Sequence, residues 1–214
     1  MVPFAPEGYP FVLVPAMAGI LAWVFGYPIL AWACWLAMVA CVAFFRDPAR
    51  RSDAAPEVVL APADGKVLSV GAAPAALAER GLPQQVSIFM SPANVHVNRA
   101  PVSGWVREAT HTPGKHFPAF RDKASDLNEH SFVLIEGDNG PVAYKQIAGS
   151  LARRVVCDLA AGQRVERGRR VGLIKFGSRV DLFLPAGASV EVAPGRITRA
   201  GVTPVARFAP GPRP

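Results

Sequence analysis

The first part of the chain is an apolar run that extends from Gly8 to Phe45 without a charged residue. Gly26-Tyr27-Pro28 divides this run into two stretches, at about 11–26 and 28–45, because glycine and proline are the residues that most often interrupt a helix. A bilayer core requires about 20 apolar helical residues, with about 17 as the lower limit. The pattern therefore predicts a hydrophobic helical hairpin that forms an N-terminal membrane anchor over residues 1–45.

Two other structures could explain an apolar N-terminus. A secretory signal peptide begins with basic residues, whereas the first 45 residues contain no Lys or Arg. Buried core helices of a soluble protein are the second alternative. Arg46, Arg50 and Arg51 follow the apolar run, and the positive-inside tendency then predicts that the rest of the chain lies on the cytoplasmic face of the cell (inner) membrane.

After the apolar run, short β-forming segments recur and are separated by turn sequences such as Pro62-Ala63-Asp64-Gly65. Strands at this spacing predict a mainly β (α+β) fold, with an antiparallel barrel or sandwich over residues 46–214. The only helical pattern is weak and covers Ala73–Arg80. The expected strands are Val58–Leu60, Lys66–Val70, Gln85–Met90, Gly104–Thr110, Ser131–Glu136, Val142–Ala148, Leu151–Cys157, Val171–Phe176, Arg179–Leu184 and Ser189–Val192.

The charge of the chain is concentrated in the predicted β-rich domain, since all 23 Lys and Arg residues lie after Phe45. Such a surface attracts nucleic acid or anionic lipid. No aromatic-basic RNA motif or recognition-helix pattern occurs, so lipid is the expected partner, with a solvated basic surface as the alternative. Cys34, Cys41 and Cys157 are too scattered for a disulfide framework or a zinc site, which predicts reduced thiols.

The dipeptide Gly177-Ser178 lies between two strand-like segments and is a candidate site of self-cleavage. A serine hydroxyl can attack the preceding carbonyl and convert the amide into an ester. Elimination and loss of ammonia would then leave a pyruvoyl group at a new chain start. A glycine turn can adopt the strained backbone that exposes such a carbonyl. A simple hairpin turn is the alternative, and Gly149-Ser150 has a similar setting, so the dipeptide alone does not decide.

Several blocks, in order along residues 45–185, resemble the short (archaeal or bacterial-type) phosphatidylserine decarboxylases, which depend on a pyruvoyl group. The resemblance implies cleavage at Gly177-Ser178 into a large chain, 1–177, and a small chain, 178–214, which remain associated as a heterodimer. The blocks are Phe45-Arg46-Asp47-Pro48, Ala61-Pro62-Ala63-Asp64-Gly65-Lys66-Val67, Met90-Ser91-Pro92, Val95-His96-Val97-Asn98-Arg99-Ala100-Pro101, Gly114-Lys115, Asp122-Lys123-Ala124-Ser125, Asn128-Glu129, Gln146-Ile147-Ala148-Gly149, Ala152-Arg153-Arg154 and Phe176-Gly177-Ser178-Arg179-Val180.

The same resemblance implies the activity and the cofactor. Membrane phosphatidylserine would be decarboxylated to phosphatidylethanolamine and carbon dioxide in phospholipid biosynthesis. The reaction would proceed through a Schiff base with a pyruvoyl group derived from Ser178. Nucleic acid is not an expected partner, and a higher oligomer of the heterodimer is left open.

Three further residues are candidates for the site. His96 is expected to transfer protons, since histidine titrates near neutral pH, and a structural histidine is the alternative. The resemblance connects Asp64 with self-cleavage, as a residue that orients a histidine, whereas Asp-Gly turn chemistry is the competing explanation. Arg99 is expected to bind the lipid phosphate or carboxylate, or to form a surface salt bridge.

Arg99 also marks a departure from longer relatives, which carry a processing histidine at this position. Arginine cannot act as a base at ordinary pH. Either His96 performs both proton transfers, or turn strain and oxyanion stabilisation drive the cleavage.

Other chemistries are less consistent with the sequence. His111, His116 and His130 lack metal-ligand spacing, so no metal site is expected, and Gly177-Ser178-Arg179 does not match the Gly-x-Ser-x-Gly motif of α/β-hydrolases. Two other functions are retained as alternatives. One is an uncleaved, non-enzymatic, membrane-anchored β-domain that binds anionic lipid, and the other is a pyruvoyl enzyme that acts on a soluble amino acid.

Overall fold

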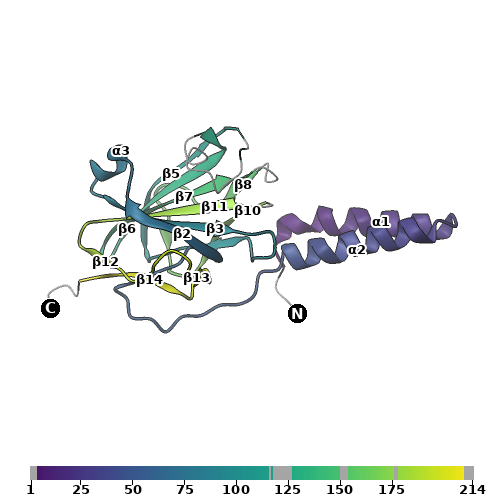
Figure 1. Ribbon diagram of the computed structural model, residues 1–214, viewed down its shortest axis with the longest axis horizontal. Helices are drawn as coiled ribbons and strands as arrows, with labels where there is room; N and C mark the ends of the chain where they lie inside the picture. Colours follow the sequence, from purple (N-terminus) through teal and green to yellow (C-terminus); the bar gives the residue numbers. More distant parts are fainter. Residues whose placement is uncertain (1–3, 116, 118–126, 150–153, 176–177, 210–214) are drawn as a thin grey trace. The chain divides into compact units, whose positions relative to one another are not determined.

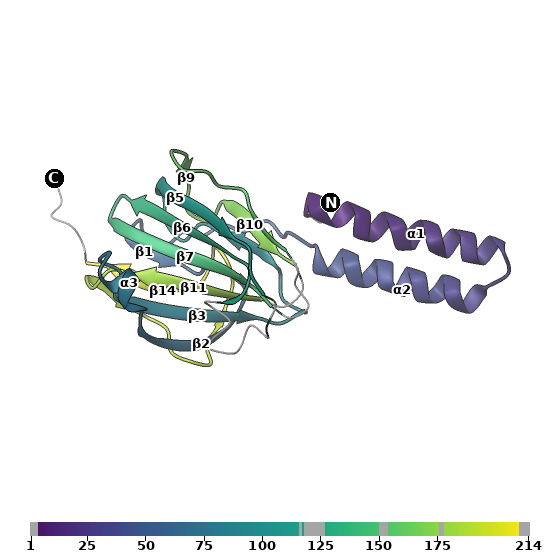
Figure 2. The ribbon, with the colours of Figure 1, turned by 90° about the horizontal axis from the view of Figure 1, so that it is seen from above.

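The computed structural model describes residues 4–115, 117, 127–149, 154–175 and 178–209. Its internal contacts divide the chain into two compact units, Met1–Ala49 and Arg50–Pro214. The first unit is an apolar helical hairpin, and the second consists mainly of antiparallel strands (Figure 1, Figure 2). The expected fold class, a mainly β domain preceded by a hydrophobic helical hairpin, is therefore confirmed.

The hairpin contains the 3-10 turn η1 (Pro6–Gly8) and the helices α1 (Tyr9–Val24) and α2 (Pro28–Phe44). Between the helices Gly26 has a φ of +78°, which glycine adopts without a steric penalty. Pro28 begins α2, where the missing N–H of proline has no helical partner to lose. Relative to the stretches expected at about 11–26 and 28–45, α1 lies two residues earlier and α2 ends one residue earlier.

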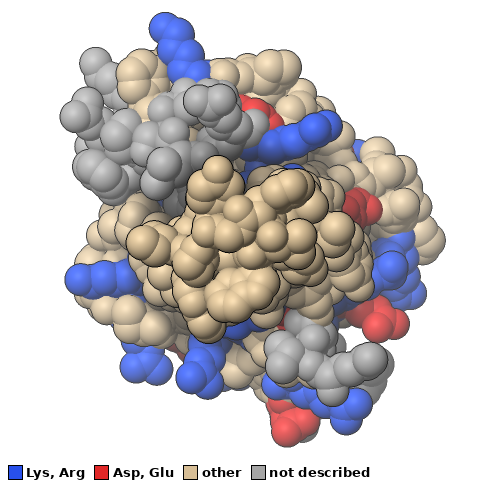
Figure 3. Space-filling model, turned by 90° about the vertical axis from the view of Figure 1, so that its right-hand side faces the viewer, with Lys and Arg blue, Asp and Glu red and all other residues tan. Residues whose placement is uncertain are grey.

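The surface of the two long helices is apolar on almost every side. Large apolar side chains such as Val14, Ile29 and Leu36 are exposed, and Figure 3 shows a tan surface without charged side chains where the hairpin faces the viewer. Pro6–Val24, with 19 residues, is long and apolar enough to cross a membrane, whereas Pro28–Phe44 has 17 residues. A helix that is apolar all round requires protein or lipid around it, so the hairpin supports membrane association.

The described residues of the β-rich unit form three antiparallel sheets. The large sheet has the order β13-β2-β3-β11-β7-β6-β5-β9, and the small sheets have the orders β4-β10-β8 and β1-β14-β12. The elements are β1 (Val58–Leu60), β2 (Gly65–Ala72), α3 (Ala75–Ala78), β3 (Gln84–Met90), β4 (Val97–Arg99), β5 (Gly104–Thr112), β6 (His130–Gly137), β7 (Gly140–Ala148), β8 (Val155–Cys157), β9 (Arg164–Val165), β10 (Arg170–Ile174), β11 (Ser178–Leu184), β12 (Ala188–Val190), β13 (Ile197–Thr198) and β14 (Pro204–Phe208).

Strand β11 lies in the middle of the large sheet, between β3 and β7. Its alternating Val180, Leu182 and Leu184 contribute to the main hydrophobic core, as a period of two residues predicts. The sequence pattern indicated one buried face, but every residue of β11 is buried. On the second face Phe183 packs with Leu82 and other apolar side chains.

The second face of β11 also contains a buried ion pair. Arg179 Nε lies 2.6 Å from Asp181 Oδ1, and Arg179 Nη2 donates to Ser87 Oγ at 3.0 Å. Burial of a charge is costly unless the charge is paired and hydrogen-bonded. This pairing explains why a strand with alternating polar residues can be buried on both faces.

Candidate functional site

Ser178 is the first residue of β11 and lies opposite Met90 of β3 and Ala148 of β7. Its side chain is completely buried, and Oγ donates to Met90 Sδ over 3.2 Å. The candidate nucleophile is therefore held by a strand ladder on both sides. Gly177, the other half of the predicted cleavage site, lies outside the described residues.

The second Gly-Ser pair begins near the same place. Gly149 follows Ala148 at the end of β7 and is buried, whereas Ser150 lies outside the described residues. Because Ala148 is the ladder partner of Ser178, the described member of each dipeptide, Gly149 or Ser178, lies at the same end of the large sheet. The backbone arrangement therefore does not distinguish between them, and the choice of Ser178 still depends on the sequence blocks.

Amide side chains from β4 and β7 extend the polar group that begins at Ser178. Asn98 Nδ2 lies 3.7 Å from Met90 Sδ, and Gln146 Nε2 donates to Asn98 Oδ1 at 2.8 Å. All three side chains are completely buried. Met90, Asn98 and Gln146 were not among the predicted site residues, although all three belong to the sequence blocks quoted above, and this was the signal that could have identified them.

Two buried polar atoms on the core-facing side of β7 have no hydrogen-bond partner among the described residues, namely Gln146 Oε1 and the Tyr144 hydroxyl. Native proteins contain few such atoms. Burial, with smaller effects of Cys157 and Asp158, raises the pKa of Tyr144 well above its usual value. Tyr144 is therefore neutral, and it lies two residues before Gln146 on the same face of the strand.

His96 is completely buried in the segment that leads into β4. Its Nδ1 lies 2.9 Å from the main-chain oxygen of Asn94, and Asn94 Oδ1 accepts from both the backbone N–H and the hydroxyl of Ser91. A carbonyl oxygen can only accept, so Nδ1 carries the hydrogen in this contact. In the neutral ring the basic position is then Nε2.

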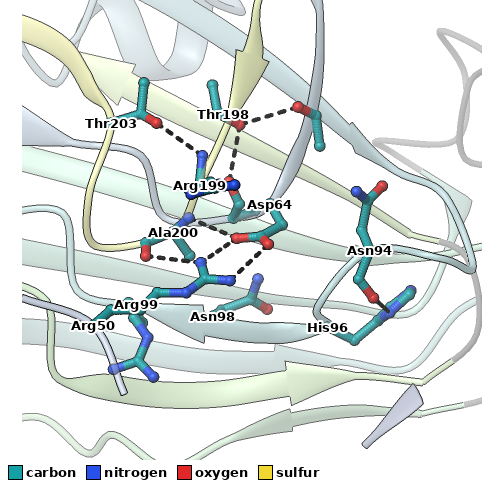
Figure 4. Close-up of polar contacts among 12 residues, drawn as sticks. Arg50, Asp64, Asn94, His96, Asn98, Arg99, Thr198, Arg199, Ala200 and Thr203 are labelled. Atoms are coloured by element: carbon teal, nitrogen blue, oxygen red, sulfur yellow. Dashed lines mark hydrogen bonds and ion pairs between the residues drawn. The ribbon is translucent and has the colours of Figure 1, made fainter. Parts of the chain in front are cut away.

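Asp64 contacts an arginine rather than a histidine (Figure 4). Arg50 binds both carboxylate oxygens, with Nη2 at 2.7 Å from Oδ2, and the backbone N–H of Ala200 donates to Oδ1 at 2.7 Å. Arg50 also donates to Ala200 O at 3.0 Å. The polar partners of Asp64 among the described residues are therefore Arg50 and Ala200, and its expected contact with a histidine is not seen among them.

Asp64 and Ser178 nevertheless lie at the same end of the large sheet. Asp64 directly precedes β2, whose Lys66 pairs with Phe89 of β3, and Ser178 pairs with the next residue, Met90, on the other side of β3. One strand thus separates them. Since Asn98 contacts Met90 and lies two residues after His96, the fold brings the candidate residues into one region.

The Arg50–Asp64 pair gives a stability prediction. Replacement of Arg50 by Met leaves a carboxylate that is 11% exposed without its cation. We expect the free energy of unfolding to fall by about 3–5 kcal/mol, as is typical when one member of a buried pair is removed. Urea unfolding of the detergent-solubilised protein, with Ser178→Ala in every chain so that all of them stay uncut, measures the change.

Arg51→Met is the matched control, because Arg51 is the adjacent arginine and is exposed. We expect this variant to remain within about 0.5 kcal/mol of the unsubstituted protein. Equal small losses in both variants would show that the Arg50–Asp64 contact contributes little to stability.

Arg99 is the last residue of β4 and is buried, with 9% of its surface exposed. Its Nη1 donates to the main-chain oxygen of Gly168 at 3.0 Å, and Gly201 packs closely against its side chain. A surface salt bridge, one of the two expected roles, does not agree with this burial. The other expected role, binding of an anionic group, stays a prediction.

A basic hollow of about 840 Å³ lies beside the Arg50–Asp64 pair. Its lining includes Gly168, the hydrogen-bond partner of Arg99, but neither Ser178 nor His96. The arginines that line it are Arg50, Arg51, Arg164, Arg167 and Arg169. Asp53, Asp138 and Glu166 also line the hollow, so its lining carries a net positive charge, and it is separate from the candidate nucleophile.

The remaining candidate ligands and nucleophiles do not form a second reactive centre in the described part of the chain. Burial raises the pKa of the Cys157 thiol, which therefore stays protonated and is a poor nucleophile. No group of three or more His, Cys, Asp or Glu side chains among the described residues is placed to hold a metal ion. His116 lies outside those residues.

Comparison with known proteins first shows the class of enzyme, a decarboxylase. The family model described as phosphatidylserine decarboxylase matches residues 38–206, a span that includes Asp64, His96, Arg99 and Ser178. The chain therefore belongs to the phosphatidylserine decarboxylase family, as the resemblance of its sequence blocks implied.

Individual relatives are similar along nearly the whole chain, and each is named phosphatidylserine decarboxylase proenzyme. The relative in Magnetococcus marinus is 44% identical over 209 residues, which cover 95% of this chain and 94% of the relative. The relative in Nitrobacter winogradskyi is 45% identical over 210 residues, with coverage of 96% and 85%. The relative in Trichlorobacter lovleyi is 44% identical over 213 residues, with 95% of each chain covered.

Proposed function

We propose that this chain decarboxylates phosphatidylserine to phosphatidylethanolamine in phospholipid biosynthesis, with a pyruvoyl group that it generates from Ser178. The observation that carries the proposal is the position of Ser178, a buried serine at the start of the central strand of a family member. The names of the relatives support the substrate, and the word proenzyme in those names supports a processing step in those proteins.

The proposed processing step begins with attack of Ser178 Oγ on the carbonyl carbon of Gly177. The amide C–N bond breaks, the serine nitrogen takes up a proton, and an ester joins the two parts. Loss of the Ser178 α-hydrogen then expels the Gly177 carboxylate, which retains the serine oxygen, and leaves a dehydroalanine. Addition of one water and release of one ammonia convert this residue into the pyruvoyl group, so the atoms balance.

The surroundings of Ser178 are suitable for that group. A pyruvoyl ketone supplies an electron sink for loss of a carboxylate from an amine-bearing substrate, as carbonyl cofactors do. Main-chain pairing with β3 and β7 would hold the new chain start in place. The side chain at position 178 is small and buried beside Met90 and Ala148, so little water would compete with the elimination step.

Three other residues are assigned roles in this proposal. His96 would transfer protons through Nε2, since its Nδ1 is bound to Asn94. Asp64 would act in processing, held by Arg50 and the Ala200 amide. The charge and burial of Arg99 are suited to binding the phosphate or carboxylate of the lipid.

The two products of cleavage, 1–177 and 178–214, would remain a heterodimer. Strands β11, β13 and β14 follow the cut. Strand β11 pairs with β3 and β7, strand β13 pairs with β2, and strand β14 pairs with β1. The hairpin would anchor this heterodimer in the inner membrane. Arg46 and Arg51, which follow α2, favour a cytoplasmic position for the β-rich unit by the positive-inside tendency.

Intact-mass measurement of the purified protein tests the proposal directly. We expect two chains that divide between Gly177 and Ser178, with the smaller chain lighter by one ammonia than a chain that begins with serine. Carbon dioxide release from phosphatidylserine vesicles should accompany the cut form. A single full-length mass from a folded preparation would instead favour an uncleaved lipid-binding domain.

A further inference from the structure

We infer that Met90 is a positioning residue for the Ser178 hydroxyl, and that its thioether sulfur carries this role. The inference rests on the proposed self-cleavage at Ser178. Met90 ends β3 directly opposite Ser178 in the ladder, and both side chains are completely buried. The distance from Ser178 Oγ to Met90 Sδ is 3.2 Å, with the hydroxyl as donor.

The chemistry of sulfur explains how Met90 could orient a nucleophile. A thioether has no hydrogen to donate and is a weak acceptor, so the hydroxyl hydrogen of Ser178 points toward the sulfur and the oxygen lone pairs point away from it. Nucleophilic attack requires a lone pair directed at the carbonyl carbon. A weak acceptor also releases the hydroxyl readily when its proton must pass to a base, whereas a charged acceptor would bind it more strongly.

The sulfur is itself fixed by an amide pair. Methionine has a flexible side chain, so its sulfur can orient a partner only when a neighbour restrains it. Asn98 Nδ2 lies 3.7 Å from Sδ and 3.4 Å from the main-chain oxygen of Pro62. Gln146 Nε2 donates to Asn98 Oδ1 at 2.8 Å. Asn98, supported by Gln146, thus holds the sulfur of Met90 next to the Ser178 hydroxyl.

A purely structural role for Met90 predicts something different. Methionine often fills irregular space in a core, and Met90 belongs to the main hydrophobic cluster. If only its bulk mattered, an isosteric side chain without sulfur would serve equally well. Norleucine is such a side chain, because a methylene group replaces the sulfur and the length is kept.

The test uses the full-length chain with Met17→Leu and Met38→Leu, so that Met90 is the only methionine after the start residue. The protein is made by cell-free synthesis with methionine, norleucine or selenomethionine, and the appearance of the small chain is followed on denaturing gels. We expect norleucine to slow cleavage by about two- to threefold, the factor that corresponds to a hydrogen bond at the weak end of the usual range, because the thioether is a weak acceptor. Selenomethionine should restore the rate, because selenium is also an acceptor.

Two further measurements separate the possible outcomes. Met90→Leu, a swap that conserves volume and is generally well tolerated, should slow cleavage as norleucine does. The melting temperature of the uncut Ser178→Ala chain should be the same with methionine and with norleucine, which excludes unfolding as the cause. Cleavage of the norleucine chain at or above the methionine rate would overturn the inference. Absence of cleavage in the methionine chain would instead contradict the proposed function.

Discussion

Ser178→Ala is expected to leave one uncut chain of 214 residues with no measurable decarboxylase activity. Alanine has no oxygen with which to attack the Gly177 carbonyl, so neither the ester nor the pyruvoyl group can form. Mass measurement of the purified variant, together with carbon dioxide release from phosphatidylserine vesicles, gives both results.

The fold should survive this substitution, which makes the loss chemical rather than structural. The only side-chain hydrogen bond described for Ser178 is to Met90 Sδ, a weak acceptor that loses little when its donor is removed. Backbone pairing of residue 178 with β3 and β7 does not involve the hydroxyl. The variant should therefore show the circular dichroism of a folded, mainly β protein and a cooperative melting transition.

Ser189→Ala is the matched control for Ser178→Ala. Ser189 is exposed on β12, within the same segment that follows the predicted cut. This variant should be cut and should decarboxylate at the normal rate. Normal cleavage of Ser178→Ala would eliminate the self-processing mechanism at this residue.

His96→Asn should lower decarboxylation by about 10²–10⁴-fold, the contribution typical of a positioned proton-transfer group. Asparagine can still donate to the Asn94 carbonyl in the manner of Nδ1, but it has no basic nitrogen in place of Nε2. Turnover must be expressed per molecule of cut chain, because a change in processing would also reduce the observed activity.

His130→Asn provides a close control for the histidine variant. The Nδ1 atom of His130 lies 2.8 Å from the main-chain oxygen of Asn128, so both histidines contact a carbonyl two residues earlier along the chain. We expect the control to keep its turnover within about twofold, because asparagine can still donate to the Asn128 carbonyl and the proposal gives His130 no part in proton transfer. Normal turnover per cut chain in His96→Asn would assign His96 a structural role.

The sequence predicted the elements whose patterns are local. Val180, Leu182 and Leu184 alternate along β11, and the uncharged run before Arg46 predicted the two helices. Strand β14 was missed because it begins with Pro204 and contains a charged residue, Arg207, both unusual in a strand that lies between two others. The helical pattern at Ala73–Arg80 produced only the four-residue helix α3.

The contacts of the candidate site depend on long-range pairing, which local patterns do not contain. Asp64 and Ala200 are 136 residues apart, yet the amide of Ala200 binds the carboxylate. Asn98 and Gln146 likewise meet only because β4 and β7 approach each other through the core. The sequence blocks nominated Asp64, His96 and Ser178, whereas the contacts of Arg50 with Asp64 and of Met90 with Ser178 are seen only in the folded chain.

The distribution of β11, β13 and β14 over two sheets has a consequence for the order of folding and cleavage. The continuous chain can fold as one molecule, since all three strands are covalently joined to the rest. In a cut protein the same strands would belong to a separate peptide. Refolding would then require the two chains to associate, so its rate would depend on their concentrations. The mature protein would then have folded before it was cut, and a denatured sample of the two chains could not refold in a unimolecular reaction.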